Sequence, residues 1–126
     1  MKNPKDSFLR GRIRSLKFAF KGFWILVSTE DSIKAQLFFA FIATILGFYF
    51  DISAAEWSAQ VIVIGLVLVA EGANTAIEEM ADFVHPEYHK KIGLIKDIAA
   101  GVPTIAALTS LVIACIIYVP KIMILF

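Results

Sequence analysis

The chain has 126 residues, of which 59% are hydrophobic and 18% are charged, with a formal net charge of +1 and a mean hydropathy of +0.77. A small soluble domain must keep a large share of its residues at a polar surface, so these values exclude a soluble globule, a disordered chain and a disulfide scaffold. The single cysteine, Cys115, lies in an apolar run that predicts a buried packing residue. The composition therefore predicts an all-α integral membrane protein, with residues 1–126 forming one membrane-embedded domain.

Residues 7–29 predict an amphipathic helix that lies on the membrane surface. Apolar side chains recur at helical spacing, and a basic stripe lies about 100° round the same helix. The apolar positions are Leu9, Ile13, Leu16, Phe20, Trp24 and Val27, and the basic positions are Arg10, Arg14, Lys17 and Lys21. We expect the basic stripe to face anionic headgroups or an anionic ligand at the cytoplasmic leaflet. A topology signal without chemistry is the other interpretation of the same charges.

Three further segments, 33–50, 56–84 and 96–119, predict membrane-spanning helices. Residues 98–120 carry no charge and are numerous enough to cross ~30 Å of hydrocarbon. The middle segment is uncharged only over residues 57–70, but its helical pattern continues through several carboxylates. We therefore expect this span to extend to the cytoplasmic interface.

The distribution of lysine and arginine predicts the orientation of these spans. Seven of the twelve basic residues precede the first span, and three lie at residues 90–96, where the last two spans are connected, whereas residues 51–56 have none. By the positive-inside rule, the N-terminus is cytoplasmic and the C-terminus lies outside. Tyr49, Trp57 and Tyr118 are then expected in the aromatic belt at the outer interface.

Four polar residues of the middle span share one helix face, about 80° wide: Glu71, Asn74, Glu78 and Asp82. Ionisable groups near hydrocarbon are costly, so they are candidates for a functional site. Carboxylates on one face repel one another unless a cation is present, and Mg²⁺ prefers oxygen ligands together with phosphates and water. Glu30, just before the first span, could supply a further ligand. Helix-to-helix contacts and a proton or ion path remain alternatives for this face.

Acidic and basic residues also follow this face, in the connection to the last span. Glu87, Tyr88 and His89 are followed by lysines, and then by Lys96 and Asp97. Neither of the glycine-rich phosphate-binding motifs is present in the sequence. A bound nucleotide would therefore be held by metal, carboxylates and lysines.

These residues resemble the signature of the prokaryotic integral-membrane diacylglycerol kinases, a family that includes undecaprenol kinases. The matching motifs are Glu71-Gly-Ala-Asn-Thr-Ala-Ile-Glu78, Asp82, Pro86-Glu-Tyr-His89 and Lys96-Asp-Ile-Ala-Ala100. The resemblance implies a homotrimeric helical bundle in the bacterial inner membrane that phosphorylates a lipid hydroxyl with MgATP. It also implies active sites at the cytoplasmic interface that are shared between neighbouring subunits.

The resemblance also implies roles for single residues. Glu71 would be the general base, and Glu30 and Glu78 would hold Mg²⁺. The ATP contacts would be Glu30, Glu78, Glu87, Tyr88, His89, Lys96 and Asp97. Asn74 and Asp82 would complete the polar face, and the lipid contacts would be Trp24, Gln36 and Glu71.

Two departures from the family pattern bear on the lipid substrate. Phe18 stands where some members have an aromatic hydroxyl, and Gln36 stands where some have an acid. We expect diacylglycerol as the acceptor, giving phosphatidic acid, with undecaprenol and its phosphate as the alternative. A small oligomeric channel or transporter that uses the intramembrane carboxylates is the alternative from another class of protein.

Overall fold

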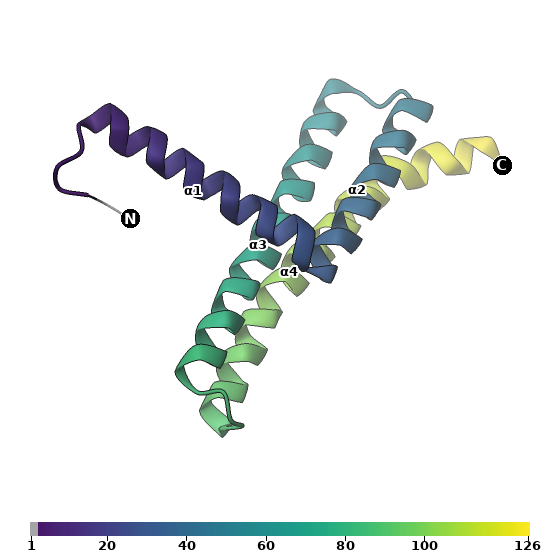
Figure 1. The fold of residues 1–126 in the computed structure, drawn as a ribbon. Coiled ribbons are helices and arrows are strands. Elements are labelled where there is room, and N and C mark those ends of the chain that lie inside the picture. Colours follow the sequence, from purple (N-terminus) through teal and green to yellow (C-terminus); the bar gives the residue numbers. More distant parts are fainter. Residues whose placement is uncertain (1–2) are drawn as a thin grey trace.

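The computed structural model describes residues 3–126, which form four helices joined by short connections (Figure 1). The helices are α1 (Phe8–Thr29), α2 (Asp31–Tyr49), α3 (Ala54–Val84) and α4 (Lys90–Leu125). Helices α2, α3 and α4 are long and apolar enough to cross a membrane. The predicted all-helical fold with three candidate spans is therefore confirmed.

Helices α3 and α4 extend beyond the segments predicted as spans, although α3 ends at residue 84 as expected. Helix α4 begins at Lys90 and runs to Leu125, well beyond the predicted 96–119, and α3 begins at Ala54. The predicted limits followed the loss of charged residues, whereas a helix continues for as long as its backbone hydrogen bonds are made. Helix α4 also contains Pro103 and Pro120, and its last turns bend away from the bundle (Figure 1), as proline bends a helix.

Helices α3 and α4 run antiparallel and pack along one another, and α2 packs on α3. Figure 1 shows that the α3–α4 hairpin continues well past the start of α2. Helix α1 meets the bundle at its C-terminal turns and projects away from it (Figure 1). None of the residues 8–29 of α1 is buried.

The turn between α2 and α3 is fixed by backbone geometry. Ile52 N donates to Gly47 O at 3.1 Å, and Asp51 N donates to Phe48 O at 3.3 Å. Asp51 has φ of 49°, and this pair of bonds around a left-handed residue closes the end of α2. Aspartate tolerates that conformation better than most residues. The chain can therefore reverse direction within a few residues.

The same end of the bundle is closed by side chains. Ser53 and Glu56 form a capping box at the start of α3, and the Glu56 carboxylate also accepts from Lys121 Nζ of α4 at 2.6 Å. The Trp57 ring lies on α2 where Gly47 has no side chain, because a Cβ there would lie 2.6 Å from the ring. These contacts join α2, α3 and α4 at the turn end.

Gln60 and Tyr118 form a polar connection across the inside of the bundle. Gln60 Nε2 donates to the Ala43 carbonyl at 3.1 Å. The Tyr118 hydroxyl lies 2.5 Å from Gln60 Oε1 and 3.1 Å from the same carbonyl. The prediction that Tyr118 belongs to an aromatic belt is wrong, because Tyr118 is buried. Its hydroxyl finds partners inside the bundle, where an unpaired hydroxyl would be costly.

Most large apolar side chains of the four helices are exposed on the single chain. Cys115 is exposed as well, so the prediction that it is buried is wrong. In a soluble protein an apolar neighbourhood implies burial, but an apolar face of a membrane-spanning helix can point outward to lipid or to another chain. Local hydropathy does not separate these two cases.

Candidate active site

The polar face of α3 begins with Glu71 and Asn74. Asn74 Nδ2 donates to Glu78 Oε1, one turn further along the helix, at 3.3 Å. Asn74 Oδ1 is buried, and it has no hydrogen-bond partner among residues 3–126. A buried carbonyl oxygen without a donor is costly, so this face contains an acceptor whose partner is not supplied by residues 3–126.

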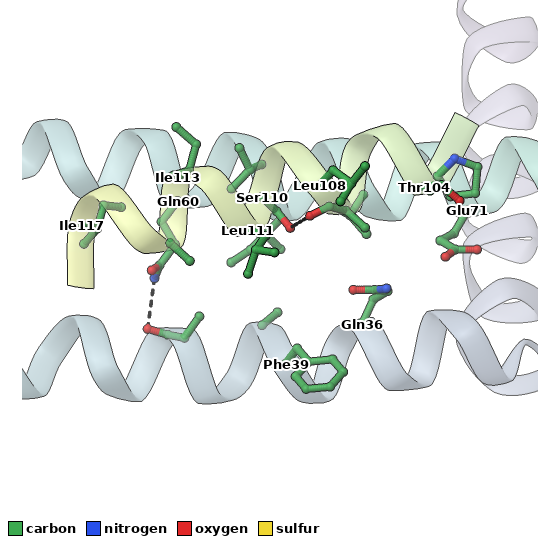
Figure 2. A pocket seen from close by; sticks show the side chains of 18 of the residues that line it. Gln36, Phe39, Gln60, Glu71, Thr104, Leu108, Ser110, Leu111, Ile113 and Ile117 are labelled. Carbon is green, nitrogen blue, oxygen red and sulfur yellow. Dashed lines mark hydrogen bonds between the residues drawn. The ribbon is translucent and has the colours of Figure 1, made fainter. Parts of the chain in front are cut away.

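An elongated groove of about 760 Å³ opens between α2, α3 and α4, beside this face. Figure 2 shows Glu71 of α3 and Gln36 of α2 at one end of the groove, and Gln60 and Ile117 at the other. The walls between the two ends are mostly apolar and include Phe39, Ala40, Leu108 and Leu111. Glu71 therefore lies where an apolar groove meets a row of polar groups.

The far end of the polar face is joined to α4 by an ion pair. The Asp82 carboxylate accepts from Lys96 Nζ, and Glu78 also attracts this ammonium group electrostatically. The side chain of Lys96 stays 35% exposed. Asp97 follows Lys96 in sequence, but the helix turns it to another, exposed face. An exposed pair of this kind contributes little to stability, so its lysine is available to a stronger anion.

The connection between α3 and α4 exposes Glu87, Tyr88 and His89. His89 caps α4, because its Nδ1 accepts from Lys91 N at 3.1 Å. With Nδ1 as the acceptor, a neutral His89 ring carries its proton on Nε2. This ring therefore offers an N–H donor at the end of the hairpin, near the start of α4.

Helix α1 reaches α3 next to Glu71. Leu26 of α1 lies close to Gly72, where an added Cβ would come within 3.2 Å of its side chain. Glu30 follows one turn later, at the corner between α1 and α2. Glu78 lies about 9 Å further along α3 than Gly72, by the helical rise.

Within residues 3–126, no three histidine, cysteine or acidic side chains gather closely enough to hold a metal ion.

The structure thus distributes the predicted site residues over three places. Gln36, Glu71 and Asn74 line the groove, Asp82 and Lys96 are paired, and residues 87–89 lie in the exposed connection. Trp24 is exposed on α1, outside the residues that line the groove. Sequence reasoning missed Gln60 and Tyr118, although Gln60 is a polar residue inside an uncharged apolar segment.

Fold and site together define a small helical membrane protein with one carboxylate, Glu71, at the end of an apolar groove and further carboxylates along the same helix. The chain belongs to the prokaryotic diacylglycerol kinase family, whose sequence profile matches residues 17–118.

Two relatives illustrate the range of the family. The undecaprenol kinase of Bacillus subtilis (strain 168) is 32% identical over 108 residues, which cover 86% of this chain and 88% of that protein. The diacylglycerol kinase of Escherichia coli (strain K12) is 25% identical over 117 residues, which cover 93% and 95% of the two chains. The chain is therefore a lipid kinase, and kinases of this family use ATP.

Proposed function

We propose that this protein transfers the γ-phosphoryl group of MgATP to the hydroxyl of a lipid alcohol, with Glu71 as the general base. The observation that carries the proposal is the position of Glu71 at the mouth of the groove. A lipid whose chain lies in the groove would bring its hydroxyl to this carboxylate. Proton transfer to a carboxylate requires hydrogen-bond reach, which this placement supplies.

In the proposed reaction, the lipid hydroxyl oxygen forms a bond to the γ-phosphorus of ATP. The bond from that phosphorus to the bridging oxygen of ADP breaks, and the hydroxyl proton passes to Glu71. Positioning and charge stabilisation carry most of the catalysis in such transfers. Lys96 and His89 would donate to nucleotide oxygens, with Glu87, Tyr88 and Asp97 completing the nucleotide contacts. Asp82 would orient the lysine from α3.

The polar face of α3 also suits Mg²⁺. This cation prefers oxygen ligands and is often held by one or two carboxylates together with substrate phosphates. Glu78 has a second carboxylate oxygen outside its bond to Asn74, and Asn74 Oδ1 is a buried oxygen without a partner among residues 3–126. Glu30 would add a carboxylate from the α1–α2 corner. When bound, Mg²⁺ would neutralise phosphate charge.

Undecaprenol is the acceptor that the comparisons favour. Diacylglycerol is the acceptor expected from the sequence, but identity is higher to the undecaprenol kinase (32%) than to the diacylglycerol kinase (25%). The groove runs between α2 and α4 (Figure 2), and an isoprenoid chain could lie along it. Diacylglycerol stays the second candidate because the alignment to its kinase covers more of the chain.

Helix α1 would lie on the cytoplasmic leaflet, with Trp24 in contact with the lipid substrate. Its exposed apolar side chains and its basic residues suit that position. The N-terminus would then be cytoplasmic and the C-terminus outside, in the bacterial inner membrane.

Purified protein should consume ATP only when a lipid alcohol is added, and undecaprenol should give a higher kcat/KM than diacylglycerol. ATP consumption and transfer of labelled phosphate to the lipid measure this.

In the same assay, Glu71→Gln should lower kcat on the order of 10²-fold or more, because an amide keeps the shape of the carboxylate but cannot take the proton. Glu79→Gln, one residue beyond Glu78, is the matched control and should keep its activity. Near-normal turnover in Glu71→Gln would contradict the base assignment.

Glu30→Ala and Glu78→Ala should each raise the Mg²⁺ concentration needed for the half-maximal rate, because each removes an oxygen ligand. A Mg²⁺ titration at saturating ATP measures this. If both titration curves coincide with that of the unmodified protein, these carboxylates do not hold the metal.

Lys96→Ala should raise the KM for ATP at least several-fold and leave the KM for the lipid nearly unchanged. Its ammonium group is held beside the polar face by Asp82, whereas Lys90, six residues earlier at the start of α4, is exposed and screened by salt. Lys90→Ala is therefore the control. Equal and small effects of the two substitutions on both substrates would leave Lys96 as a topological anchor only.

The active species should be a homotrimer with shared sites. One chain leaves most of its large apolar side chains exposed and cannot shield the polar face from lipid on all sides. The mass of the protein in detergent, measured alongside turnover, tests this. A fully active monomer would rule out the proposal.

A further inference from the structure

The groove has a closed end made of polar groups. Gln60 reaches from α3 to the Ala43 carbonyl on α2, and the Tyr118 hydroxyl of α4 lies against both. Figure 2 shows the bond from Gln60 crossing to α2 at the end opposite Glu71. We call these three groups the polar bar.

Packing at the polar bar closes this end of the groove. Tyr118 of the bar belongs to a buried cluster with Ile52 and Ile117, and Phe50 and Trp57 pack against that cluster. Gln60 itself is only 4% exposed. The groove is therefore a slot with one polar mouth at Glu71 and a fixed inner end at Gln60.

The length of the slot can be calculated from the number of α3 residues between its two ends and the helical rise per residue. Glu71 and Gln60 are eleven residues apart, which corresponds to about 16 Å along a helix. This is about half of the ~30 Å hydrocarbon thickness of a bilayer, the depth of one leaflet. A hydrocarbon chain that enters from the headgroup level would reach the polar bar near the bilayer midplane.

The position of the groove favours a hydrocarbon chain over a helix of a second copy. Its length of about 16 Å matches the depth of one leaflet, and the walls between its two ends are mostly apolar. Its mouth is continuous with Glu71, whereas a packed helix would have no reason to end at that carboxylate.

We propose that Gln60 is a specificity-determining residue that sets how far the chain of the lipid alcohol enters the groove. Contacts with the groove then increase with chain length only until the chain reaches the polar bar. Any further length leaves through the open side of the groove into the bilayer. This inference rests on the proposed lipid kinase activity, and it concerns the acceptor chain and not the phosphoryl transfer.

The test compares Gln60→Ala with Gln60→Met across acceptors of increasing length. One series is geraniol, farnesol, geranylgeraniol and undecaprenol, and the other is monoacylglycerols from octanoyl to octadecanoyl. For the unmodified protein, the KM should fall with chain length and then become constant. Methionine keeps the bulk of glutamine without its hydrogen bonds. In Gln60→Met the KM should therefore become constant at the same chain length as in the unmodified protein.

Gln60→Ala removes that bulk, so the constant region should begin at a longer chain. For the first acceptor beyond the original onset, the KM should fall by about fourfold for each additional methylene that becomes buried. Ala114→Leu, which adds bulk to the groove wall just before the polar bar, should move the onset to shorter chains. This third variant tests the proposed inner end of the groove even if Gln60→Ala fails to fold.

Each outcome is decisive. The role of Gln60 would be overturned if the KM became constant at the same chain length in all four proteins. It would also be overturned if Gln60→Met and Gln60→Ala shifted that chain length equally. Neither result would affect the kinase activity itself. An unchanged onset together with a changed mass in detergent would place a second copy in the groove and would also overturn the role of Gln60. If no alcohol stimulates ATP consumption by the unmodified protein, the proposed function itself fails.

Discussion

A polar group in apolar surroundings must have a partner, and this constraint determines how the helices of the chain are arranged. Helix α3 carries polar side chains along much of its length, and several of them are paired with different partners. Gln60 is paired with Tyr118 and the Ala43 carbonyl, Asn74 donates to Glu78, and Asp82 pairs with Lys96. Because leaving a buried polar group unpaired costs free energy, the Gln60 pairing holds α2 and α4 in place against α3. The Asn74 bond lies within α3, and the exposed Asp82–Lys96 pair adds little.

The groove is a consequence of where those pairings occur. Helix α2 is held to α3 and α4 by the polar bar and by the turn end, where Trp57 packs over Gly47. Towards the other end of α2, the facing side chains include small ones such as Ala40 and Ala107, which do not fill the space between the helices. An apolar space therefore stays open and ends at Glu71.

Local pattern predicted the helices and the polar face of α3, because helical periodicity is written in consecutive residues. The pairing of Gln60 with Tyr118 was not predictable, since 58 positions separate two residues whose types are common in many contexts. The same holds for Asp82 and Lys96, where sequence adjacency drew attention to Asp97 instead. Cys115 shows a further limit: hydropathy indicates that a residue avoids water, but it does not distinguish the interior of a bundle from lipid.

Distances along α3 bear on how one 31-residue helix would serve two very different substrates in the proposed reaction. From Glu71 to Gln60 the helix extends about 16 Å in one direction, and from Glu71 to Asp82 it extends the same distance in the other. In the proposed reaction, the lipid chain takes the first, apolar stretch and the nucleotide takes the second, polar stretch, past Asn74 and Glu78 to Lys96. A phosphoryl group and a hydroxyl that are brought in from opposite directions then meet at Glu71. In this proposal α3, which is apolar at one end and carboxylate-rich at the other, helps to position both reactants, so that a kinase of this size would need no separate nucleotide domain.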